Sequence, residues 1–327
     1  MRVAVIAFIC SLVLTLISGL FAIPLLKKLK FGQNILGYVK EHDYKSGTPT
    51  MGGLFFVLSA VIVFSFVSSG KKSLSLVSVA VGLGYMAVGF LDDFVKIKMK
   101  RNEGLSPWQK TIFELVIAIV ISVYAYNRKM TRAYLPFFGG VVDFGVAFIP
   151  ISVLVFIATT NCVNLTDGLD GLAGSVSYLY FLSFATLIKL ETVKYSAFYV
   201  SVGEYENLAL LSVTLAGAII GFLTFNTFKA SVFMGDTGSL AIGGFIASMS
   251  IFGGNMLFIP FFGITFVASG ISVILQVLHF KRTGRRIFLM APLHHHFQHK
   301  GYSESKIAFC YKLVTLLVSL LSLVFYM

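Results

Sequence analysis

The chain has 327 residues, of which 57% are hydrophobic and only 12% are charged, and its formal net charge is +12. A soluble domain carries about 25% charged residues, so this composition argues against a soluble protein and predicts a multi-pass membrane protein. Because no long polar block interrupts the chain, we expect residues 1–327 to form a single transmembrane domain.

Apolar segments long enough to cross a bilayer recur along the whole chain. A spanning helix needs about 20 mostly apolar residues. The first segment is too long for a signal-peptide core, so we keep it as a span. We therefore expect an all-α polytopic membrane protein with about ten transmembrane helices, at 3–26, 51–69, 74–91, 107–126, 144–162, 171–188, 207–225, 237–253, 256–280 and 307–326.

The distribution of lysine and arginine indicates the orientation. An even number of spans places both termini on one side, and the connections rich in basic residues face the cytoplasm. One set of connections holds 16 of the 26 basic residues, and the opposite set holds eight. We expect extracytoplasmic termini and a cytoplasmic active site, and nothing in this pattern indicates a nucleic-acid partner. The cytoplasmic set comprises 27–50, 92–106, 163–170, 226–236 and 281–306.

Two adjacent carboxylates, Asp92 and Asp93, follow the third apolar segment. They could simply mark a solvated helix end. However, an acid at a helix C-terminus opposes the helix dipole, and like charges side by side raise each other's cost. A cation should offset them, either Lys96 or a Mg²⁺ ion, which binds one or two carboxylates together with phosphate oxygens.

The stretch NCVNLTDGLDG, residues 161–171, carries Asp167 and Asp170, each followed by glycine. A spacing of three residues can place both carboxylates on one face of a starting helix. A capped tight turn is the alternative interpretation.

The third motif places Asp236 between two glycines, directly before an apolar span. An acid at a helix N-terminus is a common cap, which is the simpler interpretation. Alternatively, Asp236 ligates a metal beside backbone amides that receive phosphate oxygens. Phe233 in the same loop could stack on a planar base.

Four histidines follow in APLHHHFQHKGYSESK, residues 291–306. Adjacent histidines point in different directions, which disfavours zinc and favours acid–base work or hydrogen bonds to phosphate. The basic strip at 281–286 could contact anionic membrane lipids. Further upstream, in EHDYKSGTPTMGG, Lys45 and Thr50 are candidate partners of a phosphate or a sugar, although a plain Gly/Pro turn would look the same.

Taken together, these loops come from distant parts of the chain and are expected on one face at one depth. Ionisable residues at membrane level are costly and are therefore functional candidates. We expect Asp92, Asp167 and Asp236 to converge around one cation where the cytosol meets the lipid.

The motifs LDDFVKI, NLTDGLDGLA, FMGDTGSLAIGG, GTPTMGG and APLHHHFQHKG resemble those of the phospho-N-acetylmuramoyl-pentapeptide transferases of bacterial cell-wall synthesis. The resemblance covers essentially the whole chain. It implies transfer of phospho-N-acetylmuramoyl-pentapeptide from its UDP carrier to undecaprenyl phosphate, with release of UMP and a requirement for Mg²⁺. It also implies a homodimer in the bacterial cytoplasmic membrane.

The same resemblance suggests residue roles. Asp92 resembles the base for the lipid phosphate, Asp93 lies beside it, and Asp236 resembles the principal Mg²⁺ ligand. The remaining assignments are contacts with substrate: Lys96 at a phosphate, Phe233 on uracil, Asn164, Asp167 and Asp170 at the nucleotide sugar, and Lys45, Thr50, His294, His295 and His296 as positioning groups. Gln298 departs from the acidic residue expected after the histidines.

Two other functions remain open at this point. A transferase of the same class could use UDP-N-acetylglucosamine instead, although the PLHHHF loop favours the muramoyl-pentapeptide donor. A secondary transporter would form its site from broken helices at mid-membrane. The absence of an evident inverted repeat and the gathering of polar residues at one surface disfavour the transporter.

Overall fold

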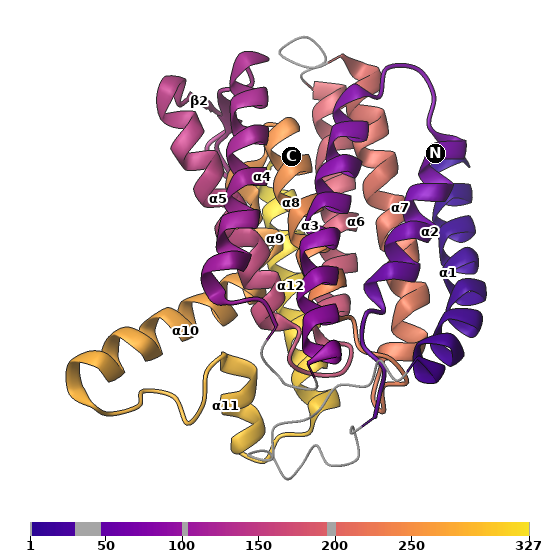
Figure 1. Cartoon of the computed structure of the whole chain (residues 1–327). Helices are drawn as coiled ribbons and strands as arrows, with labels where there is room; N and C mark the ends of the chain where they lie inside the picture. The colour runs from indigo at the N-terminus through magenta and orange to yellow at the C-terminus, as the bar shows by residue number, and fades with distance from the viewer. Residues whose placement is uncertain (1, 30–46, 100–103, 195–200, 327) are drawn as a thin grey trace.

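The computed structural model describes residues 2–29, 47–99, 104–194 and 201–326 as a bundle of long helices (Figure 1). Eight of the helical segments are long and apolar enough to cross a membrane, so the chain is a polytopic integral membrane protein. Seven of them are single helices: α1 (Arg2–Lys28), α3 (Ser73–Lys98), α4 (Pro107–Asn127), α6 (Leu172–Lys194), α7 (Val202–Asn226), α10 (Ile264–Thr283) and α12 (Glu304–Tyr326). The eighth joins the short η2 (Gly145–Ala147) to α5 (Phe148–Thr166).

Two further helices correspond to expected spans but are shorter or less apolar. The helix α2 (Gly53–Val67) has 15 residues, and α8 (Gly235–Phe252) has 18. Every residue from Thr237 to Phe252 is buried, because α8 lies at the centre of the bundle against α3 and α5. Small residues permit this close approach. A Cβ on Gly244, for example, would lie 2.6 Å from the Tyr85 ring.

The ninth expected span, 256–280, is broken and is not one continuous helix. The chain forms η3 (Met256–Phe258) and α9 (Ile259–Phe262), breaks at Gly263, and continues as α10. Pro260 occupies the first turn of α9, where its missing N–H is harmless. Beyond the break, α10 leaves the bundle sideways, and a short helix, α11 (Leu293–His299), follows it below the bundle (Figure 1).

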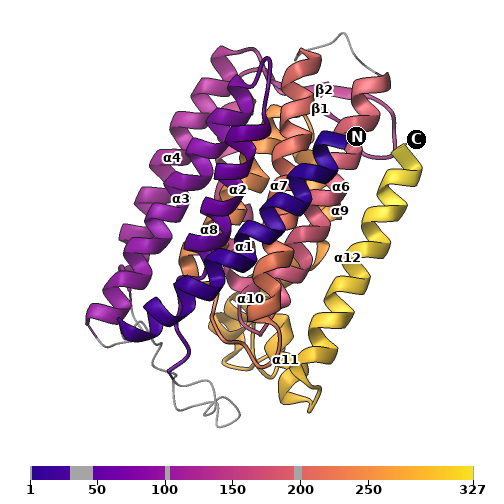
Figure 2. The ribbon, with the colours of Figure 1, turned by 90° about the vertical axis from the view of Figure 1, so that its right-hand side faces the viewer.

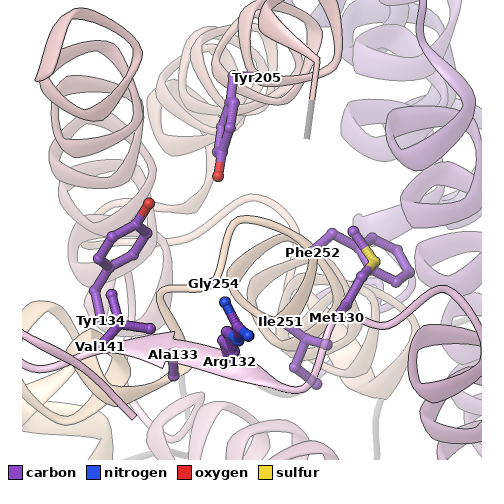
Figure 3. A pocket seen from close by; sticks show the side chains of 9 residues that line it. All are labelled: Met130, Arg132, Ala133, Tyr134, Val141, Tyr205, Ile251, Phe252 and Gly254. Carbon is purple, nitrogen blue, oxygen red and sulfur yellow. The ribbon is translucent and has the colours of Figure 1, made fainter. Parts of the chain in front are cut away.

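A small hairpin connects α4 to α5. Its strands β1 (Arg132–Tyr134) and β2 (Val141–Asp143) pair antiparallel, with Arg132 opposite Asp143. Hydrogen bonds from Arg132 and Thr131 lower the pKa of Asp143 to about 2. The hairpin lines one side of a small pocket, which Tyr205 and Gly254 also line (Figure 3). This pocket lies near the C-terminal end of α8, roughly 24 Å along the helix from Asp236, and is therefore separate from the acidic residues.

Both chain ends lie at the same end of the bundle, and α11 lies at the other (Figures 1 and 2). This arrangement is expected for an even number of crossings. The helix α3 runs from the end that carries the termini to the end that carries α11. It brings the residues at its C-terminal end, including Asp92 and Asp93, to the side of the bundle on which α8 begins.

Candidate functional site

The sequence predicted that Asp92 and Asp93 lie in the connection 92–106. In the structure they lie inside α3 instead. The helix continues to Lys98 because Lys96 reaches back one turn, with its Nζ 2.6 Å from Asp92 Oδ2. Lys96 and Lys98 also place positive charge in the last turn, which suits the helix dipole. Both aspartates are buried, at 3% and 1% exposure.

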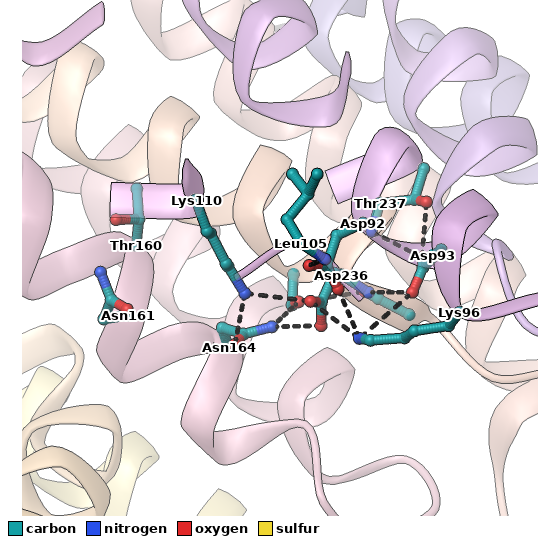
Figure 4. Close-up of polar contacts among 12 residues, drawn as sticks. Asp92, Asp93, Lys96, Leu105, Lys110, Thr160, Asn161, Asn164, Asp236 and Thr237 are labelled. Atoms are coloured by element: carbon teal, nitrogen blue, oxygen red, sulfur yellow. Dashed lines mark hydrogen bonds and ion pairs between the residues drawn. The ribbon is translucent and has the colours of Figure 1, made fainter. Parts of the chain in front are cut away.

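Asp236 is the meeting point of four helices (Figure 4). Its Oδ2 lies 3.0 Å from the Nζ atoms of both Lys96 on α3 and Lys110 on α4. Its Oδ1 accepts a 2.7 Å hydrogen bond from Nδ2 of Asn164, in the last turn of α5. Gly89 of α3 permits this convergence, because a Cβ there would overlap with the Asp236 backbone carbonyl.

The start of α4 places Lys110 in this cluster. Ser106 and Gln109 form a capping box, and Pro107 opens the helix, so Lys110 occupies the first turn. Lys110 also donates to Asn164 Oδ1 at 3.3 Å, and one turn further on Glu114 Oε2 accepts from Asn161 at 2.8 Å. These two contacts hold α4 against α5 and fix the position of the Lys110 ammonium along the helix axis.

Asp92 and Asp93 face different partners. Asp92 Oδ1 accepts from the backbone N–H of Leu105 at 2.9 Å, and a Cβ on Gly104 would lie 2.5 Å from its carboxylate. The chain that follows residues 100–103 therefore covers Asp92 closely.

Asp93 receives the N-terminus of α8. Its carboxylate accepts from the backbone N–H of Asp236 at 3.3 Å, and from both the N–H and the hydroxyl of Thr237, at 3.0 and 2.7 Å. An acid at a helix N-terminus is favourable, and here it comes from a neighbouring helix. Asp93 thus positions α8 and, through it, Asp236.

Among the described residues, Asp92, Asp93 and Asp236 form one group that could hold a metal ion, with one ligand atom of each within 4.8 Å of the others. Hard carboxylate oxygens suit Mg²⁺ or Ca²⁺. The partners of Asp93 belong to the start of α8, whereas those of Asp236 are the side chains of Lys96, Lys110 and Asn164, so Asp236 is the carboxylate better placed to exchange a partner for a cation.

Asp167 and Asp170 do not share one face of a starting helix, so that expectation is wrong. Asp167 ends α5, and Asp170 precedes α6 by two residues. Burial and the negative charge of Asp236 raise the pKa of Asp167 well above its ordinary value, although Asp167 is not one of the three carboxylates that lie within 4.8 Å of one another. Asp170 instead accepts from the backbone N–H of Ala230 at 3.0 Å and anchors the loop before α8.

The Phe233 loop is held against the segment that contains Thr50. Phe233 N donates to Pro49 O at 2.8 Å, and Gly52 N donates to Phe233 O at 2.9 Å. The Thr50 hydroxyl is buried without a hydrogen-bond partner, and a Cβ on Gly235 would lie 2.5 Å from both this hydroxyl and Asp93. Lys45 lies outside the described residues.

Two residues of the histidine segment, His294 and His295, lie close to the loop that carries Asp167. Gly168, next to Asp167, lies against the Nε2 atoms of His294 and His295. His294 is fully buried with no partner for either ring nitrogen, and burial lowers its pKa well below the ordinary value. His296 instead accepts from the Leu289 N–H at 3.1 Å and holds its own loop, so its catalytic assignment stays a prediction.

Sequence reasoning missed Lys110, Thr237 and Ser239 as members of the site. Ser239 accepts from Asn164 Nδ2 at 2.9 Å. The available signal was Lys110 itself, a lysine within an apolar span, which is costly unless it is paired.

The sequence of this chain is similar to those of known proteins. Residues 74–254 match the family model described as glycosyl transferase family 4, and residues 45–57 match signature 1 of the phospho-N-acetylmuramoyl-pentapeptide-transferases. Relatives with that transferase name include proteins of Thermoanaerobacter sp. (strain X514), 42% identical over 97% of each chain, and Clostridium perfringens (strain 13 / Type A), 43% identical over 95% of each. A protein of Caldanaerobacter subterraneus subsp. tengcongensis is 43% identical over 97% of this chain and 96% of its own.

Proposed function

This chain belongs to the phospho-N-acetylmuramoyl-pentapeptide transferase family, and we propose that its acidic cluster transfers phospho-N-acetylmuramoyl-pentapeptide from a UDP carrier to undecaprenyl phosphate. It is a phosphotransferase of peptidoglycan synthesis, and its product is lipid I. The observation that carries the site assignment is the meeting of Lys96, Lys110, Asn164 and Asp236 from four helices.

The reaction requires two anions to meet, and the cluster offers the groups that permit this. An oxygen of the lipid phosphate attacks the phosphorus next to the sugar, and the bond from that phosphorus to the bridging oxygen breaks, so that UMP leaves. Lys96 and Lys110 are placed to balance the phosphate charges. Asp92, at 2.6 Å from Lys96, is the group that would take the one proton a lipid phosphate can still carry. We favour direct attack over an aspartyl intermediate.

The cation proposed for this site is Mg²⁺, which Asp236 would hold. The donor set fits, because Mg²⁺ takes one or two carboxylates and completes its shell with water and phosphate oxygens. When bound, Mg²⁺ supplies charge neutralisation for the pyrophosphate and for the departing UMP. The buried Thr50 hydroxyl, which lacks a protein partner, offers one further hydrogen bond beside it.

Phe233 and Asn164 are proposed to contact the nucleotide sugar, Phe233 by packing on the uracil ring. Asp167 is proposed as a polar contact on the donor side. Asp170 supports this side indirectly, because it anchors the loop that carries Phe233.

The bilayer explains why the cluster lies at one end of the bundle. The lipid tail stays in the membrane and the nucleotide stays in water, so the chemistry belongs at their boundary. The apolar side chains of α10, such as Ile274 and Leu278, are exposed where the helix leaves the bundle and are a suitable surface for the tail. We propose ten spans with extracytoplasmic termini in the bacterial cytoplasmic membrane, and the homodimer stays a prediction.

The test is a UMP-release assay on the purified protein in detergent with undecaprenyl phosphate. We expect UMP from UDP-N-acetylmuramoyl-pentapeptide in the presence of Mg²⁺ and none after its removal by EDTA. Release from UDP-N-acetylglucosamine alone would favour the alternative transferase. Transport of the donor without UMP release would favour the secondary transporter, and either result would overturn this proposal.

A further inference from the structure

Both carboxylate oxygens of Asp236 are already bound by protein side chains. Lys96 and Lys110 each place an ammonium 3.0 Å from Oδ2, and Asn164 donates to Oδ1. A divalent cation that ligates Oδ2 must therefore displace at least one ammonium group, and one that ligates Oδ1 is still repelled by the positive charge of both (Figure 4). The lysine side chains are 19% and 18% exposed, so neither is fully enclosed by the protein.

We propose that Lys96 and Lys110 are internal counter-ions that compete with the cation for Asp236 and transfer to the donor's pyrophosphate when the donor binds. Cation and donor then bind cooperatively, and neither binds tightly alone. This inference rests on the proposed function, because that function supplies the pyrophosphate.

The charges of the cluster support this coupling. When ionised, the carboxylates of Asp92, Asp93 and Asp236 and the ammonium groups of Lys96 and Lys110 have a formal net charge of −1, and the raised pKa of Asp167 favours the neutral form of that nearby carboxyl group. A divalent cation alone would make the cluster net positive, and a pyrophosphate alone would make it more negative. Both together restore the original balance. Uncompensated charge is expensive in a site that is largely shielded from water, so the pair is favoured over either ligand alone.

Direct bridging of the pyrophosphate by the cation would also produce cooperativity, without any role for the lysines. The two explanations differ in what Lys110 does in the absence of the nucleotide. If Lys110 competes for Asp236, its removal should tighten binding of the cation alone. If the cation only bridges the pyrophosphate, removal of Lys110 should not tighten it.

The deciding measurement is the binding of Mn²⁺ alone, by electron paramagnetic resonance, to the full-length protein in detergent micelles. We expect Lys110→Met to lower the Mn²⁺ dissociation constant about tenfold or more, within the usual range of coupling between sites. Lys110→Arg keeps the positive charge, so its Mn²⁺ dissociation constant should stay near the wild-type value. Lys98→Met, which removes an exposed lysine from the same end of α3, should leave the dissociation constant unchanged.

Equal or weaker Mn²⁺ binding by Lys110→Met would overturn the inference. If that variant fails to fold, Lys110→Gln serves the same purpose and retains a hydrogen-bond donor for Asn164. A second titration measures Mn²⁺ affinity of the wild type with and without UDP-N-acetylmuramoyl-pentapeptide. The donor should tighten Mn²⁺ binding about tenfold, and this factor should shrink in Lys110→Met; an unchanged factor would also contradict the inference.

These outcomes can be separated from those of the proposed function. A wild-type protein that releases no UMP from any UDP-sugar would refute the transferase assignment. The Mn²⁺ titration without nucleotide would still report whether Lys110 competes for Asp236.

Discussion

The two ends of α3 show two different uses of buried carboxylates. At its N-terminus, Glu204 of α7 accepts hydrogen bonds from the backbone N–H groups of Ser73 and Leu74 at 3.0 and 2.9 Å. At its C-terminal end, Asp236 contacts lysine and asparagine side chains, and Asp92 contacts the Lys96 side chain as well as the backbone N–H of Leu105. Backbone donors belong to the fold and cannot leave, whereas side-chain cations can exchange for a ligand.

This comparison also divides the acidic cluster itself. Asp93 resembles Glu204, because its carboxylate accepts hydrogen bonds from the first turn of a neighbouring helix. Burial alone therefore does not identify a functional acid. Whether an acid is bound by backbone donors or by side-chain cations is a better guide to whether it can bind a ligand.

The largest expected effect is the loss of activity in Asp236→Asn. The change removes the carboxylate that pairs with both lysines and would hold the cation, so UMP release should fall at least about a hundredfold. The control is Asp143→Asn, which alters an exposed ion pair in the hairpin and should keep wild-type activity. Comparable UMP release by both variants would remove Asp236 from the reaction.

Asp92→Asn and Asp93→Asn should separate activity from stability. Asp93→Asn replaces charge-assisted hydrogen bonds to α8, each worth about 1.5–3 kcal/mol, and should lower the melting temperature in detergent by several degrees. Asp92→Asn should abolish UMP release with a smaller change in melting temperature. A lower melting temperature for Asp92→Asn than for Asp93→Asn would contradict the assignment of Asp93 to the fold and Asp92 to the reaction.

Glu204→Gln should weaken the fold but spare the chemistry. It keeps one acceptor oxygen for α3 and loses the charge, which should cost about 2 kcal/mol of stability. Thermal melting should record the loss, while the kcat of the folded protein at low temperature stays near the wild-type value. A large fall in kcat without a change in melting temperature would contradict the division between the two ends of α3.

The smallest expected effect is a pH dependence from His294. Burial lowers its pKa well below 6.5, so the unfolded chain binds a proton that the folded chain rejects once the pH falls below about 6.5. Stability should therefore decrease as the pH falls from 7 towards 5, by at most about 1.4 kcal/mol per pH unit. His294→Gln should reduce this slope in thermal melts, and an unchanged slope would contradict the assignment to His294.

The sequence predicted that Asp92, Asp167 and Asp236 would converge, and the structure brings Asp92 and Asp236 together with Asp93, whereas Asp167 is not among the carboxylates that lie within 4.8 Å of one another. The sequence did not predict that α3 would continue past the aspartates, since hydropathy ends a span at its first charges, whereas Lys96 stabilises another turn by pairing with Asp92. The break at Gly263 follows Pro260 by three residues, so that proline is the sequence signal for an interruption of this apolar segment.

The partners of each acid could not be read from the sequence. The contact between Asp93 and α8 joins residues 144 positions apart, and it depends on glycines that permit close approach of the two helices. The role of Lys110 likewise follows from the position of α4 beside α5. The resemblance to a family identified the motifs, and the packing distinguishes the acids that hold the fold from those that can hold a ligand.

The most direct test of the central claim is the location of a bound cation in an experimental structure of the protein with Mn²⁺ and UDP-N-acetylmuramoyl-pentapeptide. We predict an anomalous scattering peak in contact with the Asp236 carboxylate, with Lys110 turned towards the pyrophosphate. A peak that lies away from Asp236, with Lys96 and Lys110 still paired to it, would contradict the account.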